Sequence, residues 1–167
     1  MAQSSNSSLL LDIAPVRNLE KPKVAIIATE WNDAIIAAQV AGAKKIARET
    51  DAVITAEMYV PGCFELPFAV KMLYDRSFQA NHAPEAIIVF GAVIRGGTPH
   101  FDYVCKAVTE GITHLNLSLP VPVIFGVLTL DNEAQAWERL GGAHGHKGEE
   151  AMITALKMIR LKRSYLK

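Results

Sequence analysis

Four apolar runs are spread along the chain, and each is followed by a stretch in which apolar residues return every three or four positions. Such runs are typical of strands buried in a parallel sheet, and the returning positions are typical of a helix face packed on that sheet. The pattern predicts helices over 34–49, from 67 to about 74, from 101 onward, in a short stretch after 131, and over 149–162. It predicts four strands, at 23–29, 53–60, 86–90 and 121–129.

The second run differs from the others because its apolar and polar residues alternate. Ile54, Ala56 and Met58 are separated by Thr55 and Glu57. A strand with this pattern keeps one face in contact with water, whereas a central strand of a parallel sheet is apolar on both faces. We therefore expect this run to form an edge strand of the sheet.

Because strands and helices alternate four times, the chain is predicted to fold as a three-layer α/β sandwich of the flavodoxin-like type. A four-stranded parallel sheet with strand order 2-1-3-4 would carry helices on both faces. Residues 23–167 are expected to form this single domain, after a flexible or extended N-terminal arm over 1–22. Ligands of such sheets bind beyond the carboxyl ends of the strands, so functional residues are expected in the loops there.

Composition narrows the classes of partner. The chain has 167 residues, of which 50% are hydrophobic, enough for one domain with a sizeable core. A formal net charge of +0 argues against nucleic acid as the main partner, because binding phosphate backbones needs a basic surface. No apolar run approaches the ~18 residues of a membrane span, and the start lacks the basic region of a signal peptide. With Cys63 and Cys105 expected to stay reduced, we predict a soluble cytoplasmic protein that contacts no membrane.

The third strand runs into a glycine-rich turn, Gly96-Gly97-Thr98, which is followed by Pro99, His100 and a helix. The free N–H groups and the dipole of a helix N-terminus favour an anion, so this turn is predicted to bind a phosphate beside a histidine. A P-loop is disfavoured because Gly97 occupies the position of its lysine. An ordinary turn without a ligand remains the alternative.

The loops at two other predicted strand ends add further candidates. Trp31 and Asn32 follow the first strand, and Phe64 and Glu65 follow the second. An indole ring, a carboxylate beside an aromatic ring and a phosphate turn would meet at one edge of the sheet. Together these groups suit a ligand with a flat ring, a polyol chain and a phosphate.

Four segments are recognisable as a set: VPGCFELPFAVK, GAVIRGGTPHFDYVCKAVTEGI, PVIFGVLTLDNEAQAWERLGG and HKGEEA. They strongly resemble the 6,7-dimethyl-8-ribityllumazine synthase family, collinearly from about Lys23 to the C-terminus. The resemblance implies a transferase of riboflavin biosynthesis that condenses 5-amino-6-(D-ribitylamino)uracil with 3,4-dihydroxy-2-butanone 4-phosphate. Such an enzyme releases phosphate and water, and it needs no metal or redox cofactor.

The resemblance also implies roles by position. His100 matches the acid–base histidine of the family, and Arg139 matches a phosphate clamp that a neighbouring subunit contributes. Trp31 matches an aromatic residue that stacks on the pyrimidine ring, and Glu65 matches the acceptor for the ribityl hydroxyls. The implied substrate-binding residues are Trp31, Asn32, Gly62, Cys63, Phe64, Glu65, Ala92, Val93, Ile94, Gly97, Thr98, Phe125 and Lys147, of which Phe125 also comes from the neighbour.

Several of these residues have a plainer interpretation. Trp31 can be a core aromatic, Glu65 can cap the helix that follows it, and Arg139 can be a solvated surface charge. His144 and His146 are two closely spaced histidines, which suggests a metal site. Two histidines with no acidic or thiol partner between them are weak evidence, however, and we predict no metal.

A clamp supplied by a neighbour implies a homo-oligomer, since a monomer would then have no complete site. The family builds pentamers, and in many members twelve pentamers close into a 60-subunit shell. Segment 141–146 lacks the insertion often found in members that stop at the pentamer, so we expect the shell. Leu140 and His146 depart from the alanine and asparagine that are more usual there. Riboflavin synthase is a candidate partner, and the N-terminal arm is a candidate strand for a neighbour's sheet.

Two other functions stay open on the sequence alone. A non-catalytic flavin- or lumazine-binding module would keep the ring and ribityl sites, and a shell-forming scaffold would need no intact pocket. Thr98, His100 and Arg139 together favour the enzyme, because neither alternative needs all three.

Overall fold

The computed structural model describes residues 12–80 and 82–165. At its centre is a four-stranded parallel sheet in the order β2-β1-β3-β4, as predicted for a flavodoxin-like α/β fold. The strands are β1 (Lys23–Thr29), β2 (Val53–Val60), β3 (Ala86–Ile94) and β4 (Val123–Leu130). The two middle strands, β1 and β3, are apolar and almost wholly buried, as expected for strands covered on both faces.

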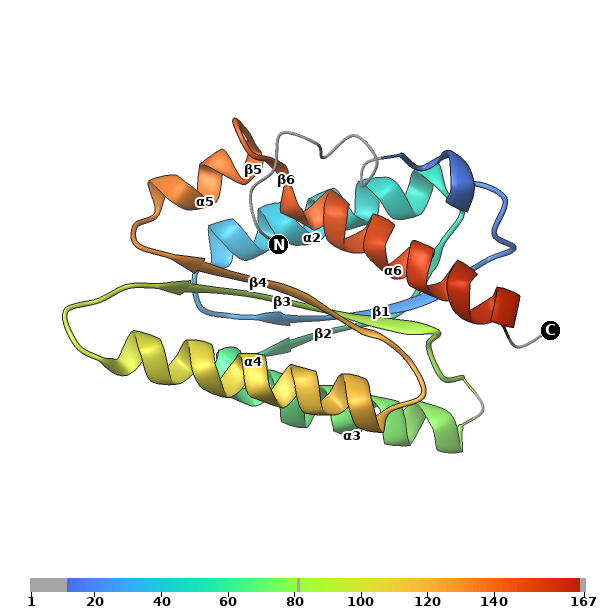
Figure 1. The fold of residues 1–167 in the computed structure, drawn as a ribbon, viewed down its shortest axis with the longest axis horizontal. Coiled ribbons are helices and arrows are strands. Elements are labelled where there is room, and N and C mark those ends of the chain that lie inside the picture. Colours follow the sequence, from blue (N-terminus) through green and yellow to red (C-terminus); the bar gives the residue numbers. More distant parts are fainter. Residues whose placement is uncertain (1–11, 81, 166–167) are drawn as a thin grey trace.

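Helices cover both faces of the sheet (Figure 1). On one side lie α2 (Asp33–Glu49) and α6 (Lys147–Tyr165), and on the other lie α3 (Leu66–Gln79) and α4 (His100–Ser118). The short elements are the 3-10 turns η1 (Ala14–Val16) and η2 (Cys63–Glu65), helix α5 (Ala134–Glu138), and strands β5 (Leu140–Gly142) and β6 (Gly145–His146). None of the helices in the described ranges combines the length and apolar character needed to cross a bilayer.

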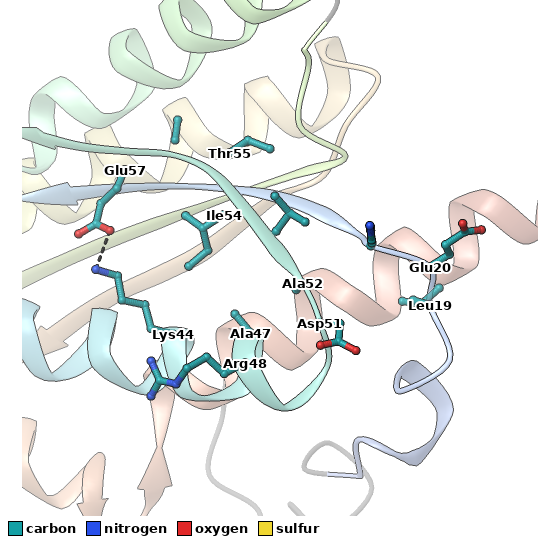
Figure 2. A pocket seen from close by; sticks show the side chains of 13 residues that line it. Leu19, Glu20, Lys44, Ala47, Arg48, Asp51, Ala52, Ile54, Thr55 and Glu57 are labelled. Carbon is teal, nitrogen blue, oxygen red and sulfur yellow. Dashed lines mark ion pairs between the residues drawn. The ribbon is translucent and has the colours of Figure 1, made fainter.

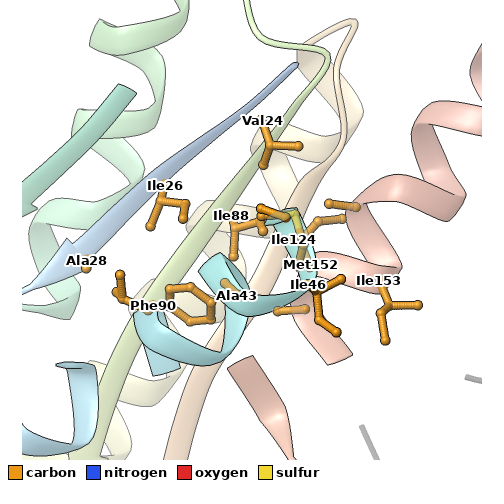
Figure 3. Packing of buried hydrophobic residues seen from close by; sticks show 14 of the residues in the cluster. Val24, Ile26, Ala28, Ala43, Ile46, Ile88, Phe90, Ile124, Met152 and Ile153 are labelled. Atoms are coloured by element: carbon orange, nitrogen blue, oxygen red, sulfur yellow. The ribbon is translucent and has the colours of Figure 1, made fainter. Parts of the chain in front are cut away.

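The sheet separates two apolar clusters, and each cluster packs one pair of helices. In the cluster of Figure 3, Phe90 and Ile88 from β3 meet Ala43 and Ile46 from α2. Met152 from α6 completes the same layer. The helical periodicity in the sequence therefore identified the correct inward faces, including the face of α4 that carries Val104, Val108, Ile112 and Leu115.

Strand β2 lies at the edge of the sheet, which confirms the prediction from its alternating pattern. The pairing register shifts between Val24 and Ala25 of β1, opposite Thr55. Because one extra residue reverses the direction of the side chains that follow it, Ile54 packs against the α2–α6 cluster and Met58 against the α3–α4 cluster.

Several predicted element boundaries differ from those of the structure, among them the end of β3, which runs to Ile94 instead of residue 90. Helix α3 continues to Gln79 instead of ending near Tyr74, because the sequence contains no breaker there and the ring of Phe78 stacks on that of Tyr74. Segment 143–148 is no simple loop, because β5 and β6 form an antiparallel hairpin and α6 begins at Lys147 instead of 149. Left-handed φ angles at Gly141 (112°) and Gly145 (75°) allow the chain to turn so tightly.

The segment before β1 is part of the predicted N-terminal arm. Residues 1–11 of that arm lie outside the described residues. In residues 12–22, Val16 is fully buried against the α2–α6 cluster, and Ile13 and Leu19 pack beside it. The apolar side chains of this stretch therefore belong to the core of the domain.

We expect Gly148→Ala to destabilise the fold, because α6 packs closely against the backbone of α2 at this glycine. A Cβ atom at Gly148 would lie 2.1 Å from the carbonyl oxygen of Gln39, which is backbone and cannot rotate away. Overpacking of this kind costs about 1–3 kcal/mol, so the urea midpoint of unfolding should fall. Gly96→Ala is the control, since a Cβ there meets no atom of the described chain within 4 Å. Equal midpoints for the two variants would contradict the predicted contact.

A second stability prediction concerns pH. Arg163 of α6 donates two hydrogen bonds to the carboxylate of Glu85, at 2.7 and 2.6 Å, and the backbone N–H of Lys23 donates a third at 3.0 Å. Burial raises the pKa of Glu85, but these hydrogen bonds and the nearby positive charges outweigh burial and bring it below the ordinary 4.5. A lowered pKa contributes stability that is present above pH 4.5 and is lost as the pH falls through the folded value.

Glu85→Gln should therefore be less stable than the unmodified protein at pH 7, and the difference should shrink below pH 4.5. Urea unfolding at pH 7, 5 and 3 measures it. Glu49→Gln, at an exposed glutamate that ends α2, is the matched control. A difference for Glu85→Gln that is the same at pH 3 and pH 7 would show that the ion pair does not carry the effect.

Candidate functional site

The loop after β1 places Trp31 at the carboxyl edge of the sheet. Asn32 takes a left-handed conformation, with φ of 61°, and its side-chain amide donates a hydrogen bond of 2.9 Å to the carbonyl of Ala92 at the end of β3. Asn32 thus ties two strand ends together, whereas Asp33 accepts a hydrogen bond from the N–H of Ala34 in the first turn of α2. Trp31 is 73% exposed, which excludes the core interpretation of this residue within the monomer.

The loop after β2 brings an aromatic ring and a carboxylate to the same edge. Phe64 is half exposed, and its ring lies 6.1 Å from the ring of His100 at a tilt of 39°. Glu65 occupies the N-cap position of α3, yet its side chain makes no capping hydrogen bond within the described chain. A Cβ atom at Gly62 would lie 3.3 Å from Oε2 of Glu65 and 3.7 Å from Cδ1 of Trp31. The indole and the carboxylate therefore flank the same glycine.

Cys63 lies in this loop, but its side chain points into the core. Its Sγ would be 2.6 Å from a Cβ atom at Gly91, so the thiol fills the space that this glycine leaves in β3. Burial, assisted by the nearby Cys105 and Glu65, raises the pKa of Cys63 to about 12. The thiol is therefore neutral at physiological pH and packs as a small apolar group. If Cys63 contacts a ligand, the contact is made by its backbone and not by its thiol.

The end of β3 leads directly into the predicted phosphate turn. Ala92 is buried, Val93 and Ile94 are partly exposed, and Gly97 and Thr98 are exposed. Helix α4 begins at His100, one residue earlier than predicted, with Pro99 at its N-cap. Thr98 and His100 thus flank the N-terminus of a long helix, where free N–H groups and the helix dipole favour an anion.

Arg95 is a residue of this turn that the sequence analysis missed. Its guanidinium donates to Asp131 at 3.1 Å and to Asp102 at 3.4 Å, and it lies 4.0 Å from the ring centre of Phe101. One side chain therefore joins the turn after β3, the first turn of α4 and the loop after β4. The sequence feature that could have identified Arg95 is its position directly before the glycine pair Gly96-Gly97.

A second group of predicted residues lies beside the outer strand β4. Phe125 and Arg139 line a pocket of about 550 Å³, and Lys147 lines it with them. Arg139 is no solvated surface charge, since its side chain is only 25% exposed and donates to the carbonyl of Gln135 at 2.9 Å. Lys147 binds both carboxylate oxygens of Glu150 at 2.8 Å. The predicted binding role of Lys147 stays a prediction.

The predicted site residues therefore form two groups on different surfaces of one subunit. The first group, around Trp31, Phe64 and His100, lies at the carboxyl ends of β1, β2 and β3. The second lies on the open side of β4, where α5 and the β5–β6 hairpin are found (Figure 1). The start of α4, with His100, is on the opposite face of the sheet from this hairpin.

The two histidines beside and within the hairpin, His144 and His146, each lie close to another residue of the subunit. The ring of His146 packs against Gly42 of α2, where a Cβ atom would lie 2.2 Å from it. His144 lies 3.7 Å from a carboxylate oxygen of Glu138. Over residues 12–80 and 82–165, no three or more His, Cys, Asp or Glu side chains gather in a way that could hold a metal ion.

A larger groove, of about 1310 Å³, runs along β2 and the end of α2 (Figure 2). Lys44 and Glu57 form an ion pair of 2.7 Å across it. Its lining, all within the described ranges, includes none of the predicted site residues. The groove lies along the edge of the sheet, where no strand from residues 12–80 or 82–165 pairs with the outer side of β2.

Comparison with known proteins gives a consistent result. The family model described as 6,7-dimethyl-8-ribityllumazine synthase matches residues 21–163. Curated proteins named 6,7-dimethyl-8-ribityllumazine synthase are similar over most of their length. The protein of Porphyromonas gingivalis is 46% identical over 145 residues, which is 84% of this chain and 86% of the relative. That of Cytophaga hutchinsonii is 40% identical over 159 residues, covering 93% and 96%. The chain therefore belongs to the 6,7-dimethyl-8-ribityllumazine synthase family of enzymes.

Proposed function

We propose that the protein condenses 5-amino-6-(D-ribitylamino)uracil with 3,4-dihydroxy-2-butanone 4-phosphate to 6,7-dimethyl-8-ribityllumazine, in the biosynthesis of riboflavin. Family membership supports the reaction class. The observation that carries the proposal for this chain is the pairing of Phe64 with His100 at the carboxyl edge, beside the phosphate turn. A ring surface, an acid–base group and an anion site meet there, and the condensation needs all three.

The first substrate is proposed to lie across the ends of β1, β2 and β3. Trp31 stacks on its pyrimidine ring, while Asn32 and the backbone of Ala92, Val93 and Ile94 border that ring. The ribityl chain extends along the loop after β2, where Glu65 accepts hydrogen bonds from hydroxyl groups. Gly62, Phe64 and the backbone of Cys63 form the wall of this channel.

The second substrate is proposed to place its phosphate at the turn formed by Gly97 and Thr98. The amine of the first substrate attacks the ketone, and water leaves to give an imine. Phosphate is then eliminated. The ribityl-bearing nitrogen attacks the carbonyl group that forms from the resulting enol, and the ring closes with loss of a second water. Each of these steps moves a proton, and histidine is the side chain that gains and loses one most readily near neutral pH. His100 at the start of α4 is therefore the proposed proton shuttle. No metal or redox cofactor is needed for these steps.

The remaining phosphate contact is proposed to come from a neighbouring subunit. Arg139 and Phe125 line the pocket beside β4, whose lining includes no residue of the first group. A head-to-tail ring would bring this side of one subunit to the carboxyl edge of the next. A guanidinium matches the oxygens of a phosphate and stabilises the negative charge of the leaving group.

We further propose a pentamer as the unit that completes the site, closed by twelve pentamers into a 60-subunit shell. The short β5–β6 hairpin at 140–146 supports the shell, because it carries no insertion.

The open edge of β2 is the proposed place for the N-terminal arm of a neighbour to add a strand. Riboflavin synthase is the proposed partner, and the cytoplasm is the proposed location.

The experiment is to mix the purified protein with both substrates and to follow the fluorescence of the lumazine product. The uncatalysed condensation, measured without protein, is subtracted. Formation well above this background supports the proposal. Binding of the ribityl substrate without acceleration would identify a non-catalytic binder, and neither binding nor turnover would favour a shell-forming scaffold. A sedimentation profile at the mass of a pentamer would contradict the 60-subunit shell.

A further inference from the structure

Glu150 carries a buried charge that the proposed mechanism does not use. It is only 1% exposed, although it carries a carboxylate. A buried carboxylate is strongly unfavourable unless a cation and hydrogen bonds compensate its charge. Both oxygens of Glu150 accept hydrogen bonds of 2.8 Å from the ammonium of Lys147, three residues earlier on α6.

The β5–β6 hairpin closes over this ion pair. A Cβ atom at Gly145 would lie 3.1 Å from Oε1 of Glu150, so the turn approaches the carboxylate closely. The left-handed conformation of Gly145 brings the turn to that position. The ion pair therefore lies between the start of α6 and the hairpin, and it connects the two.

Lys147 is also joined directly to Arg139. The backbone N–H of Lys147 donates a hydrogen bond of 2.8 Å to the carbonyl oxygen of Arg139. Leu140, the next residue, pairs with His146 in the hairpin. A continuous path thus runs from the carboxylate of Glu150, through the side chain and backbone of Lys147, to the backbone that carries the guanidinium of Arg139.

Lys147 and Arg139, the two cations that line the pocket, therefore differ in how far their charge is already neutralised. The charges of Lys147 and Glu150 cancel at contact distance, whereas the guanidinium of Arg139 meets Glu138 only at 3.6 Å, where Glu138 is half exposed. If Lys147 moved to a phosphate, the carboxylate of Glu150 would be left buried without its cation. Lys147 is therefore held where it is, and Arg139 is the cation that remains available.

We propose that Glu150 is a positioning residue, which holds Lys147 and through it fixes Arg139, so that Arg139 and not Lys147 binds the substrate phosphate. This inference rests on the proposed function for the identity of the substrate. It changes the role of Lys147 from a substrate-binding residue to a part of the support for the clamp. The two roles predict different effects on the KM for butanone phosphate when the charge of Glu150 is removed.

The test is the KM for butanone phosphate in Glu150→Gln. If Glu150 positions the clamp, this KM should rise about tenfold, while the affinity for the ribityl substrate stays unchanged. If Lys147 is itself the phosphate ligand, its release from Glu150 should leave the KM unchanged or lower it, which would overturn the proposal. Glu149→Gln is the matched control, because it removes the same charge from the next residue, which pairs with Lys45 instead. Its KM should equal that of the unmodified enzyme.

A double-mutant cycle separates positioning from a general loss of structure. The dissociation constant of inorganic phosphate is measured by titration in four proteins: unmodified, Glu150→Gln, Arg139→Ala and the double variant. If Glu150 acts through Arg139, Glu150→Gln weakens phosphate binding in the first background and changes it less than about twofold in the second. Equal weakening in both backgrounds would overturn the proposal.

A substitute variant covers the case in which Glu150→Gln does not fold, and the turnover of the unmodified protein separates this inference from the proposed function. If Glu150→Gln fails to assemble, Glu150→Asp takes its place, because it keeps the charge and moves it by one methylene. It should show a smaller rise in KM and the same cancellation in the Arg139→Ala background. Absence of lumazine formation by the unmodified protein would count against the proposed function, whereas normal turnover with an unchanged KM in both Glu150 variants would count against this inference alone.

Discussion

Arg139→Ala is expected to lower the rate of lumazine formation by a factor of about 10²–10³, the usual cost of removing one preorganised group that stabilises developing charge. The structure supports so large an effect because the side chain of Arg139 is only 25% exposed and its guanidinium donates a hydrogen bond to the carbonyl of Gln135. A water molecule that replaces it would bring no charge to the leaving phosphate. The measurement is the initial rate above the uncatalysed background, at saturating ribityl substrate.

Arg160→Ala is the control for this prediction. Arg160 is an exposed arginine of α6. It lies thirteen residues, or roughly 20 Å, beyond Lys147 at the start of that helix. The control should retain the unmodified rate. A rate for Arg139→Ala within about threefold of the control would show that the phosphate is clamped by some other group.

His100→Ala is expected to lower kcat by a factor of about 10²–10⁴, the range for loss of one acid–base group. Affinity for the ribityl substrate should stay nearly unchanged, because the proposed contacts of that substrate are with Trp31, Phe64 and Glu65. Fluorescence titration of the ribityl substrate, alongside the rate, measures both quantities. Unchanged turnover would show that another group shuttles the protons.

A mixture of these two inactive variants tests whether the site is shared. If His100 of one subunit works with Arg139 of the next, random co-assembly should leave both residues intact in about a quarter of the sites. The co-refolded mixture should then recover about a quarter of the unmodified rate. If each subunit contained a complete site, every site in the mixture would carry one defect, and no activity would return.

The sequence alone determined the layered fold and the place of one group of candidate site residues. Buried parallel strands and amphipathic helices have distinct periodicities, so the four main strands, their order and the inward faces of the helices were predictable. Trp31, Phe64, Glu65 and His100 were predictable for a related reason. Each lies in the loop after a strand or at the start of the helix that follows it, and the carboxyl ends of parallel strands meet at one edge of a sheet.

Tertiary structure decided the features that depend on contacts between distant residues. The sequence contains no local pattern that directs the thiol of Cys63 toward Gly91, or the amide of Asn32 toward Ala92, since both are set by how separate strands lie side by side. The hairpin that links Arg139 to Lys147 was also missed. Its short strands and left-handed glycines form a turn whose shape follows from packing against α2 and Glu150, and periodicity cannot reveal such packing.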